Sequence, residues 1–183
     1  MEIKIGTKQI LKLLHIFSWI IFIGLCIDAG GFIFNTIFSY FKPIGAQYYW
    51  NHLNLSDLYK FDKGRFLITG LYSCIVVVLK AILFYLIVKV FLEKKVNLAQ
   101  PFNNAIQKFI LNSAYLTFGI GLFSSWGTTN VEWLISQGVK LPSIQDLKLG
   151  GADVWFFMSI FLFVIAQIFK RGIELQEEHE LTI

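Results

Sequence analysis

Residues 66–91 read FLITGLYSCIVVVLKAILFYLIVKVF, an apolar run that carries the charge of Lys80 near its middle. As a helix this run would be about 39 Å long, which exceeds the ~30 Å hydrocarbon thickness of a bilayer. A lysine at the centre of a membrane helix costs roughly 3 kcal/mol on insertion scales unless a partner compensates for it. The run therefore predicts a membrane span whose lysine needs a partner on another helix.

The composition of the whole chain supports a membrane location. Of its 183 residues, 56% are apolar and only 15% are charged, which is typical of a protein with several spans rather than of a soluble domain. The net charge is +4, but the lysines and arginines form no long run, which argues against direct binding of nucleic acid. Cys26 and Cys74 lie inside apolar runs, so we expect no structural disulfide.

Three further apolar segments predict spans, which gives four in all. The expected spans cover about residues 13–41, 66–91, 102–126 and 149–169. Two long outer loops, 42–65 and 127–148, and a tail, 170–183, complete a single membrane domain over residues 1–183. Residues 1–12 imitate the start of a signal peptide, but the apolar run that follows is too long, so we interpret it as a retained span. The expected fold is all-α, a four-helix membrane bundle.

An even number of spans places both termini on the same side. Nine lysines and arginines lie at or near the terminal segments and the short connector around residues 93–101. The two long loops contain six. Because positive residues favour the cytoplasmic side, both termini are expected in the cytoplasm.

Small residues recur at helical spacing in two of the spans. The first row comprises Gly24, Asp28, Gly31, Asn35 and Ser39, and the second comprises Ser113, Thr117, Gly121 and Ser125. Spacings of three and four place each row on one helix face, where small side chains let another helix approach closely. We expect Gly24, Gly31 and the second row to pack against protein, although a functional polar pocket around the first row is the alternative.

Asp28 is the expected partner of Lys80. Asp28 lies ~22 Å from the inner end of its span and Lys80 lies ~16 Å from the inner end of the second span, so the two depths differ by an amount that a lysine side chain can bridge. We expect an intramembrane ion pair facing the bundle interior. Alternatively, Lys80 extends along a water-filled crevice and Asp28 is protonated or caps a kink. The pair is either structural or part of a transport pathway.

Motifs of known enzyme classes are missing from the sequence. It contains no H-E-x-x-H, no G-x-S-x-G and no P-loop, and its three histidines, His15, His52 and His179, lie in distant segments. We therefore predict a protein that is not an enzyme and that holds no metal and no cofactor.

The end of the chain resembles a known family. Residues 166–183 read AQIFKRGIELQEEHELTI, and the match is strongest over F-K-R-G-x-E-L-Q-E-E-x-E-L-T, with Pro101-Phe102 before the third span in support. This pattern resembles the YoaS-like four-span membrane proteins of bacteria, a family of unknown function, although His179 stands where a small polar residue is expected. Members are commonly encoded beside small helix-turn-helix regulators, so the resemblance implies a bacterial inner-membrane protein with a regulatory partner.

Two functional hypotheses follow. In the first, the protein is a membrane regulator or sensor whose tail, through Arg171, Glu174, Glu177 and Glu178, binds a cytoplasmic partner such as a DNA-binding regulator. In the second, it is a small transporter or an immunity-type membrane protein that uses Asp28 and Lys80. The tail could equally be a solvated helix end, and the sequence leaves the oligomeric state open.

Overall fold

The computed structural model describes residues 7–93 and 102–180, and within these ranges the protein is all-α. Four long helices account for most of it: α1 (Thr7–Phe41), α4 (Lys63–Leu92), α5 (Asn104–Ser136) and α6 (Ala152–Glu180). Three short helices connect the first two: α2 (Ile44–Gln47), the 3₁₀ helix η1 (Trp50–His52) and α3 (Ser56–Phe61). Pro101 and residues 181–183, which contribute to the family resemblance, lie outside the described residues.

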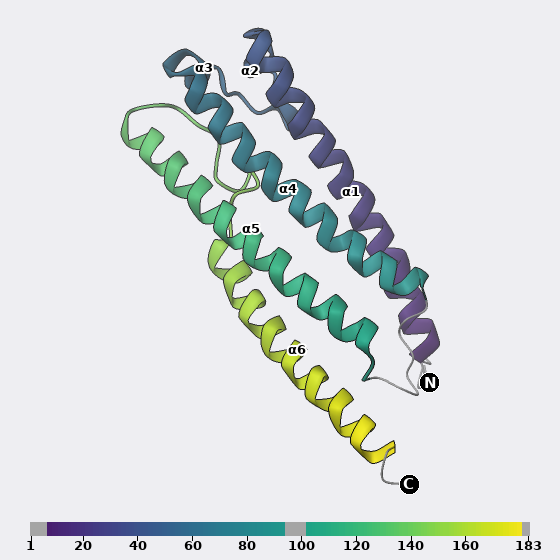
Figure 1. The fold of residues 1–183 in the computed structure, drawn as a ribbon. Coiled ribbons are helices and arrows are strands. Elements are labelled where there is room, and N and C mark those ends of the chain that lie inside the picture. Colours follow the sequence, from purple (N-terminus) through teal and green to yellow (C-terminus); the bar gives the residue numbers. More distant parts are fainter. Residues whose placement is uncertain (1–6, 94–101, 181–183) are drawn as a thin grey trace, which may run out of the picture.

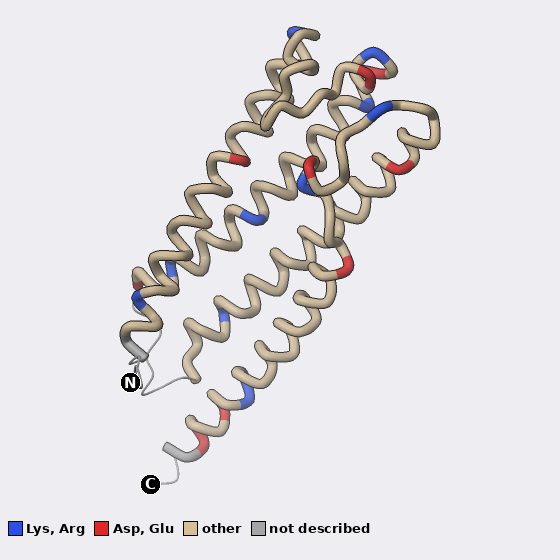
Figure 2. The backbone as a smooth tube through the Cα atoms, turned by 180° about the vertical axis from the view of Figure 1, so that it is seen from behind, with Lys and Arg blue, Asp and Glu red and all other residues tan. Residues whose placement is uncertain are grey.

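The long helices form a row in chain order, an arrangement that does not confirm the expected four-helix bundle (Figure 1). Among the described residues, α1 packs against α4, α4 against α5 and α5 against α6, while α1 and α6 do not meet. The beginning of α1 and the end of α6 lie at the same end of the row. Seen from behind, the row carries charged residues towards both ends and only scattered charges along its length (Figure 2).

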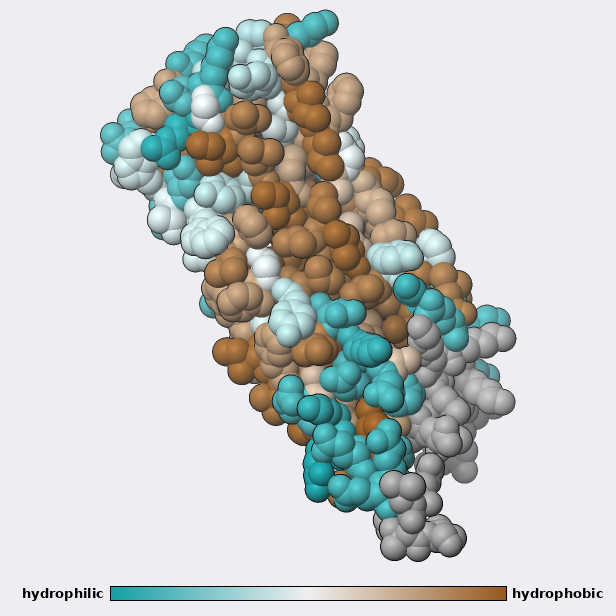
Figure 3. All heavy atoms as spheres, in the orientation of Figure 1, coloured by the Kyte–Doolittle hydropathy of each residue, from teal (hydrophilic) through white to brown (hydrophobic). Residues whose placement is uncertain are grey.

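In the part of the chain that the structure describes, three helices are long and apolar enough to cross a membrane: Gln9–Phe41, Lys63–Leu92 and Ala152–Glu178. The remaining long helix, α5, is not among these three, and serines, a threonine and glycines form half of its buried residues. The space-filling view shows a broad hydrophobic band between two hydrophilic ends (Figure 3). These features are those of a membrane protein.

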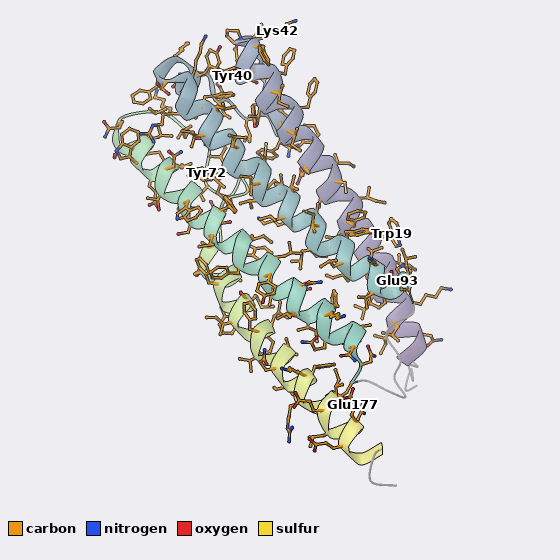
Figure 4. The ribbon with its side chains drawn as sticks, viewed as in Figure 1. Trp19, Tyr40, Lys42, Tyr72, Glu93 and Glu177 are labelled. Carbon is orange, nitrogen blue, oxygen red and sulfur yellow. The ribbon has the colours of Figure 1, made fainter. Side chains whose placement is uncertain are left out.

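Two exposed aromatic residues of α1 are of the types that favour the membrane–water interface. Trp19 and Tyr40 lie towards opposite ends of the helix (Figure 4), with exposed fractions of 38% and 40%. Their separation along the helix is about 32 Å, close to the hydrocarbon thickness of a bilayer. Tryptophan and tyrosine favour the membrane–water interface, so this pair gives a scale for the depth of other residues.

The helices are longer than the spans that hydropathy predicts. Helix α1 passes without interruption through Asp28 and Gly31, and α5 continues from the expected span to Ser136 before Gly138, with a φ of +85°, follows its end. Helix α6 likewise continues through the polar tail to Glu180. Backbone hydrogen bonds can continue a helix beyond its apolar segment. Hydropathy does not predict where these hydrogen bonds end.

The first outer loop folds into a small cap over one end of α1 and α4. Leu55 and Leu58 are fully buried there, beside Phe32 of α1 and Phe66 of α4. The Tyr49 hydroxyl lies in the same cluster and hydrogen-bonds with Thr36 Oγ1. Burial raises the pKa of the Tyr49 hydroxyl well above its usual value, so it remains neutral and acts as a structural hydrogen-bonding group.

Candidate functional site

The Asp28 side chain has polar partners in Trp50, Asn51 and Lys148, and Lys80 is not among them. One carboxylate oxygen, Oδ2, lies 3.0 Å from the ammonium of Lys148, and Oδ1 accepts a hydrogen bond of 3.0 Å from the indole of Trp50. The side chains of Asp28 and Lys148 are 23% and 33% exposed, so the ion pair is partly shielded. A charged residue of the second outer loop thus lies beside the middle of α1.

Lys80 binds the backbone of that same loop residue. Its Nζ donates a hydrogen bond of 3.0 Å to the carbonyl oxygen of Lys148 and lies 5.4 Å from the ring centroid of Trp155. The structure therefore does not bring Asp28 and Lys80 into a direct ion pair. It brings both to Lys148, and we call these three residues the Lys148 cluster.

The cluster exists because the segment after α5 turns back between the helices. Leu147 and Leu149 are buried, with 1% and 0% exposed, and Lys148 between them adopts a φ of +63°. Leu149 packs against Gly127 of α5 so closely that a Cβ added to Gly127 would overlap it, and Tyr72 of α4 borders the same spot. We call residues 139–151 the re-entrant segment.

The depth of this segment follows from the position of Leu149, which lies over Gly127 at a point that Tyr72 also borders. Tyr72 lies about 14 Å along α4 from its beginning at Lys63. Helix α6 accordingly begins part-way along the row, as Figure 1 shows. Non-helical backbone is tolerated at such depth only when its polar groups are satisfied by protein or water. Here Lys80 binds the carbonyl of Lys148, and Thr128 donates to the carbonyl of Leu149 at 3.2 Å.

The sequence analysis missed Lys148, because residues 127–148 were assigned to an outer loop. The sequence around Lys148 does contain an indication that this segment is buried: Leu147, Leu149 and the two glycines that follow. Alternating apolar residues around a single charge, next to Gly150 and Gly151, are unusual for an exposed loop. Gly151 adopts a φ of +80°, which only glycine does readily.

The two glycines proposed for packing on α1 have different surroundings. Gly31 faces the indole of Trp50, and a Cβ added there would overlap the ring. Gly31 thereby makes room for the tryptophan that hydrogen-bonds Asp28. Gly24 is exposed, and a Cβ added there would meet no atom within 4 Å. The structure gives Gly24 no packing contact.

The second small-residue row lies largely on the α5–α6 contact. Ser113 and Thr117 are buried, and a Cβ added to Gly121 would press against the ring of Phe156 on α6. Nearby, Ser159 of α6 donates a hydrogen bond of 3.1 Å to the carbonyl oxygen of Ala114. Ser125 is only half-buried. The close approach of the two helices therefore depends mainly on the part of the row from residue 113 to 121.

The tail residues belong to the last turns of α6, which we call the tail helix (residues 170–180). Arg171 pairs with Glu174 at 3.0 Å and lies 3.7 Å from Glu178. Glu177 and Glu178 are exposed, and Figure 4 shows Glu177 towards the free end of α6. The side chains of His179 and Glu180 lie outside the described part of the structure.

The beginning of α5 supports the tail helix. The ring of Phe102 occupies the space over Gly172, where a Cβ would overlap it, and lies 5.2 Å from the ring of Phe169. Beside this contact is a groove of about 430 Å³ between the two helices. It is lined by Asn104, Gln107, Leu111, Gln167, Lys170, Ile173, Glu174 and Glu177.

Comparison with known proteins identifies the family at the level of sequence. A family model described as a protein of unknown function, DUF2975, matches residues 42–183. The chain belongs to the DUF2975 family. The matched region of this DUF2975 protein contains Lys80, Lys148 and the tail helix, whereas Asp28 precedes it. No curated protein and no solved structure matches the chain.

Proposed function

We propose that this DUF2975 protein is a non-enzymatic membrane regulator or sensor that binds a cytoplasmic protein through its tail helix. The observation that supports the proposal is that α6 does not end where its apolar segment ends. It continues as a helix to Glu180 and exposes acidic side chains. An amphipathic helix beside a groove is a common recognition surface for a partner helix.

The chemistry of the groove suggests the kind of partner. Ile173 and Leu111 supply an apolar floor, amides line one side, and Glu174 and Glu177 supply negative charge. A helix with one apolar face and basic flanks would complement this surface. A small helix-turn-helix regulator, which the resemblance to YoaS-like proteins implies, has such basic surfaces, and its capture at the membrane would keep it from DNA.

Copurification from the native host tests the proposal. The full chain, a chain that ends at Lys170 and the E177K/E178K variant would be extracted in mild detergent, and bound proteins identified by mass spectrometry. E132K, which reverses an exposed charge on α5 far from the tail helix, serves as the matched control. We expect a basic protein with the full chain and with E132K, and its loss from the other two. Equal recovery with all four, or recovery of no partner, would contradict the proposal.

The Lys148 cluster supports transport as a second candidate function. Charged side chains and non-helical backbone meet at membrane depth, an arrangement that transporters use for ion and proton sites. In liposomes carrying a pH-sensitive dye, we expect the wild-type protein to conduct protons. Asp28→Asn and Lys80→Met should each abolish this flux, although both variants are still expressed. Flux that is absent from the wild type, or unchanged in both variants, would exclude proton transport through this cluster.

A further inference from the structure

A second groove opens between the last turns of α4 and the first turns of α5, on the opposite side of α5 from the contact with α6. It encloses about 140 Å³. Leu86, Val90 and Phe109 give it apolar walls, and Val90 is buried. Its polar lining residues Lys89, Lys108 and Asn112 are exposed to the surroundings.

Aromatic contacts place this groove at the membrane interface. The ring of Tyr85 on α4 lies 6.0 Å from the ring of Phe22, which in turn lies 5.9 Å from the ring of Trp19. Tyr85 is therefore near the level of Trp19, and tyrosine and tryptophan are the residues that favour the membrane–water interface. Lys89 follows Tyr85 by one helical turn, about 6 Å farther out, where the phosphates of a bilayer lie.

Two polar lining residues of the groove, Lys108 and Asn112, have no partner in a hydrogen bond or ion pair among the described residues. Lys89 lies 3.9 Å from Glu93, and both side chains are well exposed, so that ion pair is weak. Figure 3 shows hydrophilic surface reaching from one end into the hydrophobic band over this part of α5.

The charge of the groove matches that of one phosphodiester. Lys89 and Lys108 contribute two positive charges and Glu93 one negative charge, which leaves one net positive charge. Ammonium groups bind phosphate oxygens through charge-assisted hydrogen bonds. Basic pockets between membrane helices at the headgroup level are suited to anionic lipids.

We propose that this groove binds one anionic phospholipid. The phosphate lies between Lys89 and Lys108, the Asn112 amide donates to a glycerol ester carbonyl, and an acyl chain follows Leu86 and Phe109 into the bilayer. This site is independent of the tail helix. A zwitterionic lipid fits less well, because its choline cation meets the same two ammonium groups.

Native mass spectrometry of the full chain in detergent tests the assignment. Phosphatidylglycerol, phosphatidylcholine and inorganic phosphate would be titrated into wild type, K89Q/K108Q, K89R/K108R and K60Q/K140Q. The last variant removes the same charge from exposed positions at the other end of the row. We expect a single bound phosphatidylglycerol that K89Q/K108Q weakens about 30-fold, because each lysine near an anionic lipid contributes about fivefold.

The remaining variants and ligands distinguish binding at this groove from a general attraction of the lipid to positive charge. K89R/K108R and K60Q/K140Q are expected to retain wild-type affinity, and phosphatidylcholine and inorganic phosphate to bind at least tenfold more weakly. Equal weakening in K89Q/K108Q and K60Q/K140Q would mean that the lipid responds to net charge alone, and would overturn the proposal. Equal binding of the two lipids, or of inorganic phosphate, would overturn it as well.

Discussion

Lys148 binds two different charged side chains with two different groups. Its ammonium binds Asp28, and its carbonyl oxygen accepts a hydrogen bond from Lys80. One residue thereby compensates for an acid on α1 and a base on α4 that lie too far apart to compensate for each other. The left-handed backbone of Lys148, with a φ of +63°, turns the two groups in different directions.

Removing the acid should leave the ammonium of Lys148 without its counter-ion. We expect Asp28→Asn to lower the free energy of unfolding by about 1–2 kcal/mol, less than for a fully buried pair because both side chains are partly exposed. Thermal unfolding in detergent measures this. In a double-mutant cycle, Lys148→Met should cost less in the Asp28→Asn background than in the wild type. Strictly additive effects would show that the two side chains do not interact.

Gly24 and Gly31 of α1 provide a matched comparison. Gly31→Ala should destabilise the protein by about 1–3 kcal/mol, because the new methyl group overlaps the Trp50 indole and displaces it from Asp28. Gly24→Ala meets open space and should stabilise the helix by up to about 1 kcal/mol through higher helix propensity. Thermal unfolding of both variants, side by side, gives the readout. A similar response of the two would mean that Trp50 is not seated over Gly31.

At the scale of elements, the re-entrant segment and α6 together occupy the place of one span. Helix α6 begins about 14 Å below the start of α4, and residues 139–151 fill the remaining depth. Impermeant maleimide labelling of single cysteines in a C26S/C74S background tests this. Ser143 is exposed and Leu149 fully buried, so S143C should be labelled in intact membranes and L149C only after denaturation.

Labelling rates distinguish this arrangement from an ordinary surface loop. If L149C reacts as fast as S143C before denaturation, the segment does not enter between the helices. A K140C variant, also exposed, gives the reference rate for a loop position nearer the end of α5.

The elements show what hydropathy can and cannot predict. It located the apolar parts of α1, α4 and α6, which are long and apolar enough to cross a membrane, whereas α5 is not among the candidate spans of the described residues. It could not predict that α5 extends to Ser136 or that α6 extends to Glu180, since capping and tertiary contacts decide where a helix ends. The same reasoning identified Asp28 and Lys80 as residues that need partners. Their common partner, Lys148, lies in a segment whose depth depends on packing against Gly127. The spacing of residues in the sequence does not predict this packing.

At the scale of the whole molecule, the row of helices places the start of α1 and the end of α6 at the same end. Reporter fusions to the two termini should therefore report the same side of the membrane, with a cytoplasmic orientation expected from the distribution of lysine and arginine. Alkaline phosphatase and green fluorescent protein fusions at each terminus measure this. A fusion after Lys140, in the second long loop, should report the opposite side. Opposite signals from the two termini would mean that α5 or α6 does not complete a crossing.

The row also has a consequence for how the protein is made. Within residues 7–93 and 102–180, each long helix packs only against long helices next to it in the chain, so each newly synthesised helix enters the membrane beside a partner that is already there. The exception is Asp28, whose counter-ion at Lys148 emerges from the ribosome only when most of the chain has been translated. During translation the insertion machinery must therefore accommodate a lone acidic residue in the first helix, and the arrival of Lys148 marks the completion of assembly.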